Sequence, residues 1–267
     1  MDRHLRIISW NVQHTMTRAA ARIALLEDLD HRLGRWDVLC AQEVMPAMFD
    51  RLVSAFGGQA AYFFDQPGER EDGARSAAML LARPPWSLVD TNALGDAPSP
   101  LRTATAVLAR HGHRHAAVAS GALPPASMTR WGIEAKVAQA QAFRRWVESQ
   151  PTLPTLIGLD ANGPLADTLD GVTFHDERER ILFGFPTAPL TDAYRAALTD
   201  GDLRRLRRLR PEGPLAVTHM AGGNAPRRYD HILTTGCDII DAGHVIGDAL
   251  AAGSDHALVH ALLRLPA

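Results

Sequence analysis

Five segments of the sequence place carboxylate, amide or imidazole side chains directly after an apolar run. They are residues 9–13 (Ser-Trp-Asn-Val-Gln), 39–43 (Leu-Cys-Ala-Gln-Glu), 157–162 (Ile-Gly-Leu-Asp-Ala-Asn), 228–232 (Arg-Tyr-Asp-His-Ile) and 253–257 (Gly-Ser-Asp-His-Ala). Such groups bind divalent cations, orient water and transfer protons, and a strand end can present them without burying an unpaired charge. Each segment alone also fits an ordinary turn or helix cap. Together they predict one polar site where several strands end.

In this order the segments resemble the endonuclease/exonuclease/phosphatase superfamily, which includes pancreatic deoxyribonuclease, abasic-site endonucleases, neutral sphingomyelinases and inositol-phosphate phosphatases. The resemblance runs from Trp10-Asn11 to Ser254-Asp255-His256 and so spans nearly the whole chain. It implies an α/β fold of four layers, in which two mixed β-sheets pack face to face with helices on the outside, as in DNase I. We expect residues 1–267 to form a single domain of this kind.

The resemblance implies a divalent metal site. Glu43 is the leading metal ligand, Asp255 is a second candidate and Asn11 lies nearby. A hard cation that keeps several waters needs only one or two carboxylates from the protein. The expected cofactor is Mg²⁺ or Mn²⁺, which would neutralise charge on the phosphoryl oxygens of a substrate.

The remaining polar groups have the chemistry of phosphate-ester hydrolysis. Asp160 would orient or deprotonate the attacking water, and Asn162 would hydrogen-bond the phosphoryl group from the same side if the strand continues through it. His256 would contact the phosphate or assist proton transfer, and Asp230 would accept a hydrogen bond from its imidazole. Asn11, Asn162 and His256 are therefore the expected substrate-binding residues.

Ala122 departs from the pattern. Many relatives carry a histidine at the strand end that here comprises residues 118–124, and alignment places Ala122 at that position. A methyl group can neither donate a proton nor bind phosphate. Three accounts remain open: another residue substitutes, activity is reduced or lost, or the residue was replaced to trap substrate.

The composition limits the class of protein. With 28 basic and 30 acidic residues, the net charge of -2 gives no global positive field of the kind that steers non-specific nucleic-acid binders. Two cysteines are too few for a disulfide framework, which indicates a reducing compartment. Neither a signal peptide nor a membrane span is evident. We expect a cytoplasmic monomer without membrane contact.

Short β-rich runs alternate with helical patterns, which predicts an α/β fold. A crossover helix is expected at 18–33 and a second helix at 131–149. A hairpin is expected at 107–118, so the sheet should be mixed. The expected strands are 5–12, 37–42, 77–82, 103–109, 116–120, 155–159, 229–234 and 257–265.

Several histidines lie outside this set. His111, His113 and His115 alternate as ligands on one strand face would, but Gly112 between them favours a solvated turn over a metal site. His219 precedes the strand of Asp230 and could point into the pocket. His231 should face away from Asp230, because neighbours on a strand diverge.

The strongest basic cluster is the arginine-rich stretch 204–210, in which leucines recur at three-residue steps. This pattern favours an amphipathic surface helix over a contact for a polyanion.

The leading hypothesis is a metal-dependent hydrolase of a phosphodiester, with nucleic acid as one candidate, or of a phosphomonoester. The alternative is a non-catalytic or impaired relative that binds a phosphorylated ligand, which Ala122 keeps open. A third hypothesis is an α/β domain of unrelated chemistry whose matches are accidental. The sequence does not identify the substrate.

Overall fold

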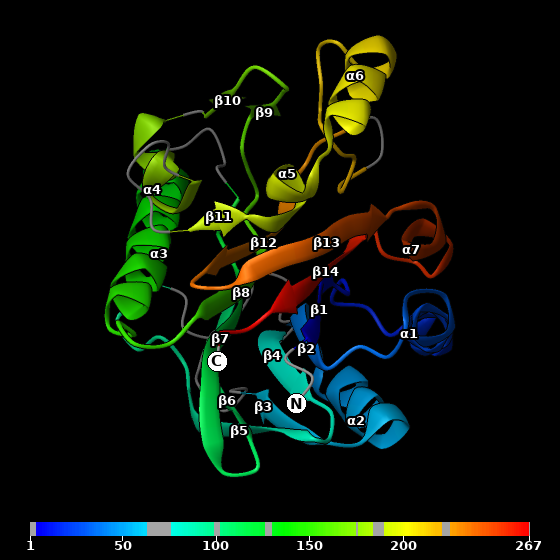
Figure 1. Cartoon of the computed structure of the whole chain (residues 1–267), viewed down its shortest axis with the longest axis vertical. Helices are drawn as coiled ribbons and strands as arrows, with labels where there is room; N and C mark the ends of the chain where they lie inside the picture. Colours follow the sequence, from blue (N-terminus) through cyan, green and yellow to red (C-terminus); the bar gives the residue numbers. More distant parts are fainter. Residues whose placement is uncertain are drawn as a thin grey trace.

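The computed structural model describes residues 4–62, 76–98, 102–125, 130–174, 176–183, 190–220 and 225–266. Strands and helices alternate along these residues (Figure 1). In chain order they are β1 His4–Asn11, α1 Ala19–Leu33, β2 Val38–Val44, α2 Pro46–Phe56, β3 Gln59–Tyr62, β4 Ala77–Ala82, β5 Trp86–Asn92, β6 Thr103–Arg110, β7 His113–Ala122, α3 Arg130–Glu148, β8 Thr155–Asp160, β9 Ala166–Asp167, β10 Val172–Thr173, the 3₁₀ turn Glu177–Glu179, α4 Arg180–Phe183, β11 Thr191–Asp192, α5 Ala193–Ala197, α6 Asp200–Leu209, β12 Asp230–Thr235, β13 Asp238–Val245, α7 Gly247–Ala251 and β14 Leu258–Arg264.

Most of the strands form two six-stranded mixed sheets. The order of the first is β13-β14-β1-β2-β4-β3, and the order of the second is β11-β12-β8-β7-β6-β5. Each contains one parallel pair, β1 with β2 and β7 with β8, among antiparallel neighbours. Strands of a parallel pair run in the same direction, so the carboxyl ends of β1 and β2 lie at one edge of the first sheet. Those of β7 and β8 likewise lie at one edge of the second sheet.

The sheets pack against each other through apolar side chains. On β1, Ile7 points between the sheets and Ile8 points to the opposite face, as the period of two requires. Gly158 of β8 allows a close approach, because a Cβ atom there would lie 2.4 Å from the Cβ of Cys40 on β2. The facing sheets therefore touch where a larger residue would separate them.

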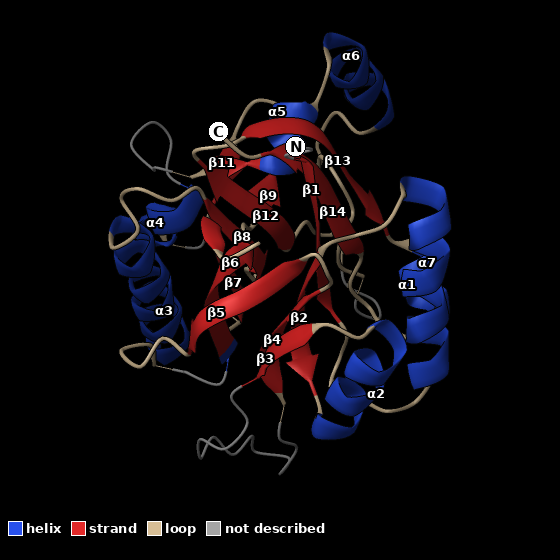
Figure 2. Cartoon of the chain, turned by 60° about the horizontal axis from the view of Figure 1, so that its bottom comes forward, coloured by secondary structure: helices blue, strands red, loops and turns tan. Residues whose placement is uncertain are grey.

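Helices cover the two outer faces. Leu26 of α1 and Met48 of α2 pack with Trp10 on the outer face of the first sheet. Phe143 of α3 packs with Ile157 on the outer face of the second. Figures 1 and 2 show α1, α2 and α7 on one side of the sheets and α3 and α4 on the other. The α/β four-layered sandwich expected from the sequence is confirmed.

The predicted elements agree with the structure at most positions. The predicted helix at 131–149 corresponds to α3, and the predicted hairpin at 107–118 is formed by β6 and β7. The turn of that hairpin contains His111 at φ 51° and Gly112 at φ 78°, with His111 and His113 exposed. Because His111, Gly112 and His113 are exposed, the solvated-turn interpretation is confirmed.

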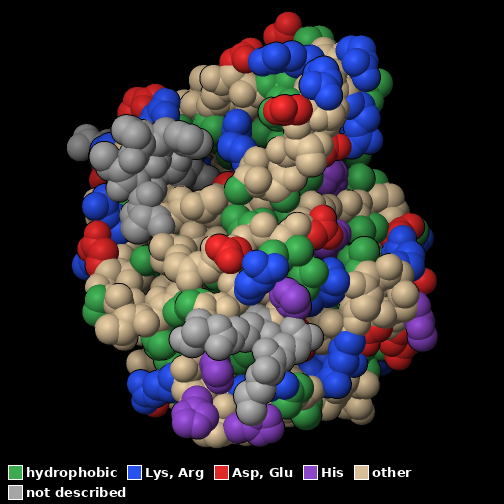
Figure 3. All heavy atoms as spheres, viewed as in Figure 1, with side chains coloured by type: hydrophobic (Ala, Val, Ile, Leu, Met, Phe, Trp, Pro, Cys, Tyr) green, Lys and Arg blue, Asp and Glu red, His purple; other side chains and the backbone are tan. Residues whose placement is uncertain are grey.

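The arginine-rich stretch forms α6, which begins with a capping box between Thr199 and Asp202. Leu206 is buried, Leu209 is 69% exposed, and the arginines on the helix are exposed. Figure 3 shows these basic side chains gathered over α6. The expected amphipathic surface helix is confirmed. No helix in the described parts of the chain combines the length and apolarity needed to span a membrane.

Candidate functional site

Asn11 and Asp160 join the two sheets at the carboxyl ends of their strands. Asn11 is the last residue of β1 and Asp160 the last of β8, and both side chains are buried. The Nδ2 of Asn11 donates to Oδ2 of Asp160 at 3.0 Å. The Oδ1 of Asn11 accepts from the backbone N–H of Gln13 at 2.9 Å. The amide is therefore fixed, and it orients the carboxylate from the opposite sheet.

Asn162 approaches Asp160 from a turn. Strand β8 ends at Asp160, and Asn162 lies in the left-handed region at φ 44°. Its backbone N–H donates to Oδ1 of Asp160 at 3.0 Å, and its Nδ2 donates to the carbonyl of Leu123 at 2.9 Å. The condition for strand alternation to align the two side chains is not met, because β8 ends at Asp160 and the backbone is left-handed at Asn162. The turn nevertheless keeps both residues together.

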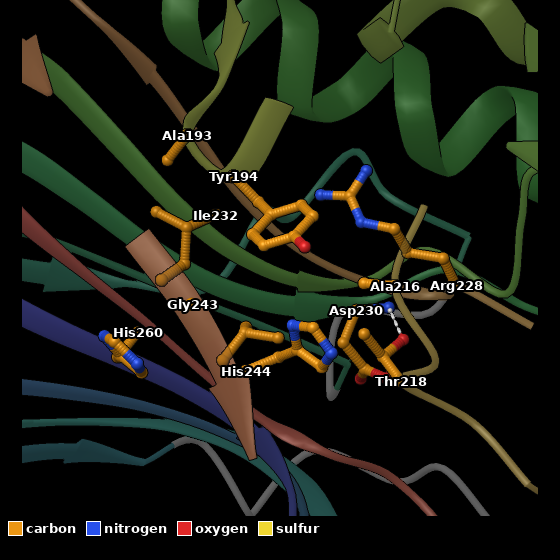
Figure 4. Close-up of a pocket in the computed structure, with 11 residues that line it drawn as sticks. Ala193, Tyr194, Ala216, Thr218, Arg228, Asp230, Ile232, Gly243, His244 and His260 are labelled. Carbon is orange, nitrogen blue, oxygen red and sulfur yellow. Dashed lines mark hydrogen bonds between the residues drawn. The ribbon is translucent and has the colours of Figure 1, made fainter. Parts of the chain in front are cut away.

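His256 and Asp230 form a buried pair. The Nδ1 of His256 lies 3.1 Å from Oδ1 and 3.0 Å from Oδ2 of Asp230. The backbone N–H of Asp230 donates to Oγ1 of Thr218 at 3.0 Å, which holds the first residue of β12 in place (Figure 4). The predicted hydrogen bond between His256 and Asp230 is confirmed.

The charges around His256 favour its protonated form. Burial alone would lower its pKa, but the carboxylates of Asp230, Asp160 and Asp255 raise the pKa of His256 to about 10. Burial raises the pKa of Asp230 from its usual range, although His256 opposes that rise. The Nε2 of His256 lies 4.0 Å from Oδ2 of Asp160. The His256–Asp230 pair is therefore next to Asp160, whose carboxylate Asn11 holds.

Asp255 and His219 border the same space. The Nε2 of His256 lies 4.0 Å from Oδ1 of Asp255, and Nε2 of His219 lies 3.8 Å from Oδ2. The rings of His219 and His256 are 4.6 Å apart, and His219 stacks on Tyr229 at 5.0 Å. Burial lowers the pKa of His219, and His256 lowers it further. His219, which the sequence only suggested, therefore belongs to the site.

The 253–257 segment is held against β1 through backbone contacts. Ser254 Oγ donates to the carbonyl of Asn11 at 2.7 Å and accepts from the backbone N–H of His256 at 3.1 Å. The indole Nε1 of Trp10 donates to the carbonyl of His256 at 3.2 Å. These bonds explain how a turn after α7 places Asp255 and His256 beside residues distant in the sequence.

Glu43 lies on β2, one residue after Gln42, which pairs with Asn11 of β1 in the parallel register. The backbone φ of Glu43 is 55°. Its carboxylate is 18% exposed and lies 2.9 Å from Nδ1 of His14. The partnership with His14 was not expected, because no periodicity relates the two residues.

Metal-ligating side chains gather in two overlapping clusters in the described part of the chain. One comprises His219, Asp255 and His256, and the other comprises Asp160, Asp230 and His256, with ligand atoms within 4.8 Å of one another. Glu43 belongs to neither. Of the two carboxylates expected to bind metal, Asp255 lies within a cluster.

Ala122 stands beside Asp160. It is the last residue of β7, pairs with Asp160 in the parallel register and is 2% exposed. The next backbone N–H, that of Leu123, donates to the carbonyl of Asp160 at 2.8 Å. At this position β7 presents only a methyl group to the site.

His231 faces a second buried network. Its Nδ1 lies 2.8 Å from Oδ2 of Asp192, and its Nε2 lies 3.2 Å from the carbonyl of Gly163. Arg228 bridges Asp192 at 2.7 Å and Asp167 at 2.6 Å. The predicted divergence of His231 from Asp230 is confirmed, and this network supports the loops beside the site.

Solved structures share the fold that positions this site. The human Nocturnin catalytic domain with bound sulfate anion is 17% identical with a TM-score of 0.69, and the match covers 100% of this chain and 96% of that one. The chain has the endonuclease/exonuclease/phosphatase fold. D. rerio TDP2 complexed with single strand DNA product has this fold at 16% identity and a TM-score of 0.67, over 98% of this chain and 99% of that one. An endonuclease/exonuclease/phosphatase from Bacteroides vulgatus is 14% identical with a TM-score of 0.66, over 98% and 99%. No family model and no curated protein matches the sequence.

Proposed function

We propose that this protein is a divalent-metal-dependent phosphoesterase that cleaves a phosphodiester. The observation that carries the proposal is the position of Asp160. Its buried carboxylate is held by Asn11 at 3.0 Å and lies 4.0 Å from the Nε2 of His256, whose other nitrogen contacts Asp230. A fixed carboxylate next to a partnered imidazole is the arrangement that general acid–base hydrolysis requires.

Each side chain has a role in this reaction. Asp160 orients the attacking water and accepts its proton, while Asn162 holds the carboxylate and hydrogen-bonds the phosphoryl group. His256 contacts the phosphate, and Asp230 orients its imidazole. Asn11 positions Asp160 and contributes to substrate binding. Because the phosphoryl group carries negative charge, donors fixed before the reaction stabilise its transition state.

Glu43, Asp255 and Asn11 are the proposed ligands for Mg²⁺ or Mn²⁺, because these ions prefer oxygen donors. Glu43 and Asp255 are carboxylates that are 18% and 30% exposed, so an ion bound to them keeps part of its water shell. The amide oxygen of Asn11 completes the proposed ligands. When bound, the ion would neutralise charge on the phosphoryl oxygens.

Nucleic acid is a candidate substrate within the phosphodiester class. The support is the DNA product in the structure of D. rerio TDP2 and the sulfate anion in that of Nocturnin. The near-neutral chain has no global positive field, so the exposed arginines of α6 are its candidate polyanion contact.

A metal-dependent hydrolysis screen tests the proposal. Plasmid DNA, RNA, abasic duplex, nucleotides, and sugar, lipid and inositol phosphates are incubated with the protein and Mg²⁺ or Mn²⁺, beside Asp160→Ala. We expect hydrolysis of a phosphodiester that requires the metal and that Asp160→Ala abolishes. Equal rates for the two proteins contradict the assignment.

A second candidate function is binding of a phosphorylated ligand without turnover. The buried methyl group of Ala122 beside Asp160 favours it, because β7 adds no polar group there. Ligand binding without hydrolysis of any substrate in the screen would support this alternative.

We also propose that residues 1–267 act as one domain, because both sheets supply residues to one site.

The two cysteines of the protein, Cys40 and Cys237, are free, and Cys40 is buried, which supports a reducing cytoplasmic setting. We propose that the protein acts as a monomer. Sedimentation of the purified protein tests this.

A further inference from the structure

His219 is fixed on the wall of the site, and its ring Nδ1 has no hydrogen-bond partner among the described residues. Isolated β-bridges pair its backbone with Arg227 on one side and with His256 on the other. Its ring packs between Tyr229 and His256. The side chain remains 15% exposed, so a ligand in the site can reach it. The backbone and two aromatic neighbours therefore hold this imidazole at one orientation.

The two ring nitrogens of His219 have different surroundings. Nδ1 is buried without a hydrogen-bond partner in the described parts of the chain, whereas Nε2 faces the carboxylate of Asp255 at 3.8 Å. A buried N–H without a partner costs more than a buried lone pair that accepts nothing. The proton is therefore expected on Nε2, which makes Nε2 a donor directed toward Asp255.

The distance of 3.8 Å is too long for a direct hydrogen bond. The Nε2 of His256 faces the same carboxylate at 4.0 Å. The Nε2 atoms of His219 and His256 thus border one space, and each lies farther than hydrogen-bond distance from the carboxylate of Asp255. An oxygen of a ligand placed in this space can accept from both rings.

We propose that His219 donates a hydrogen bond from Nε2 to a phosphoryl oxygen of the substrate, beside His256. This inference rests on the proposed phosphoesterase function and adds a substrate-contacting residue to it. At the end of β7, Ala122 offers the site only a methyl group. His219 supplies a donor instead, from the segment that precedes β12.

The same side chains could instead hold a metal ion, since His219, Asp255 and His256 form one cluster of ligand atoms. A metal on Nε2 of His219 would force the proton onto Nδ1, where it would be buried without a partner. The tautomer therefore separates the two roles: Nε2–H for the phosphate donor and Nδ1–H for the metal ligand.

The tautomer is measured by nitrogen-15 NMR of the imidazoles in the 267-residue protein, with His219→Gln to assign the signal. The predicted state is Nε2–H, with a shift of that signal when inorganic phosphate is added. A proton on Nδ1 overturns the proposal. The tautomer assignment and the phosphate-induced shift do not require turnover. A failure of the His219 proposal is therefore distinguishable from a failure of the proposed hydrolysis.

Calorimetric titration tests the contact itself. Inorganic phosphate and, separately, Mn²⁺ alone are titrated into wild type, His219→Leu, His219→Gln and the control His113→Leu, in which an exposed histidine is removed. His219→Leu should weaken phosphate binding about 10- to 100-fold, the range for a hydrogen bond to a charged group, and leave Mn²⁺ affinity unchanged. His219→Gln, which retains an N–H donor, should restore much of the loss.

Three results of the titration count against the proposal. They are no phosphate binding by wild type, equal phosphate affinity in wild type and His219→Leu, and a loss of Mn²⁺ affinity in His219→Leu with phosphate binding unchanged. The last would assign His219 to the metal.

Discussion

The imidazole Nδ1 of His256 lies 3.0 Å from Oδ2 of Asp230, and both side chains are buried. A buried imidazole that uses one nitrogen for a carboxylate has its other nitrogen fixed in direction. Here that nitrogen is Nε2, which lies 4.0 Å from both Asp160 and Asp255. The site therefore depends on Asp230, which orients His256 and need not touch the substrate.

Asp230→Asn is expected to lower kcat by on the order of a hundredfold or more, because the amide holds the imidazole less well in its catalytic orientation. KM should change little. The measurement is steady-state kinetics on the best substrate from the screen, with the exposed Asp238→Asn as the matched control. If both variants retain wild-type kcat, the pair has no part in catalysis.

Much of the fold could be predicted because buried strands carry a strong apolar signal. Strand β8 is buried at every position, and its apolar run also marks where Asp160 must emerge. Strand β13 was missed, because it lies at the edge of its sheet, is exposed or half-buried along its length and is interrupted by a register shift between Ile239 and Asp241. Edge strands lack the pattern that burial imposes.

The site was predictable in its residue types and less so in its geometry. The Asp230–His256 pair was expected from the family resemblance together with residue chemistry, whereas the left-handed backbone at Asn162 and Glu43 is not encoded by any periodicity. The contact of Glu43 with His14 depends on that backbone. The proposed role of Glu43 as a metal ligand therefore stays a prediction.

Removing the metal tests that role. Chelation is expected to abolish hydrolysis, and added Mg²⁺ or Mn²⁺ to restore it. Glu43→Gln, which loses the charge but keeps the shape, should raise the metal concentration for half-maximal rate by about tenfold or more. The exposed Glu148→Gln is a control. Unchanged metal dependence in Glu43→Gln would remove Glu43 from the proposed ligands.

Ala122→His tests whether the site lacks a group. An imidazole beside Asp160 could supply a further proton donor, so turnover with metal should rise, by up to about a hundredfold. Kinetics of both proteins on the screened substrates give the result. A slower variant would instead indicate that the site is adapted to a substrate that the added ring obstructs.

The ion pair of Lys136 and Glu179 is expected to maintain the Asn162 turn. Both side chains are 2% exposed and 2.5 Å apart, and Nζ of Lys136 also donates to the carbonyl of Asn162 at 2.8 Å. Lys136→Met leaves a buried carboxylate unpaired and should lower the free energy of unfolding by about 3–5 kcal/mol. Urea unfolding measures it, and adding Glu179→Met should recover much of the loss. No recovery in the double variant would contradict the ion-pair explanation.

Stability should fall in mild acid because of His244. It lines an interior pocket with His260 and Asp230 (Figure 4). Burial, with Arg228 and Arg210, lowers the pKa of His244 from 6.5 to about 4. The unfolded chain therefore binds the proton first as pH falls, so stability present above about pH 6.5 is lost toward pH 4, by up to about 3 kcal/mol. Urea midpoints across this range should decline less in His244→Gln, and identical declines would exclude this cause.

Hydrolysis of bis(p-nitrophenyl) phosphate by wild type and Asp160→Asn, each with and without Mn²⁺, tests the central claim most directly. Asp160→Asn preserves the size of the side chain that Asn11 contacts and removes its capacity to accept a proton. We predict nitrophenolate release that requires Mn²⁺ and falls by about a hundredfold or more in Asp160→Asn. Mn²⁺-dependent release at equal rates from both proteins, or no release from wild type with Mn²⁺ bound, would contradict the proposed phosphodiesterase.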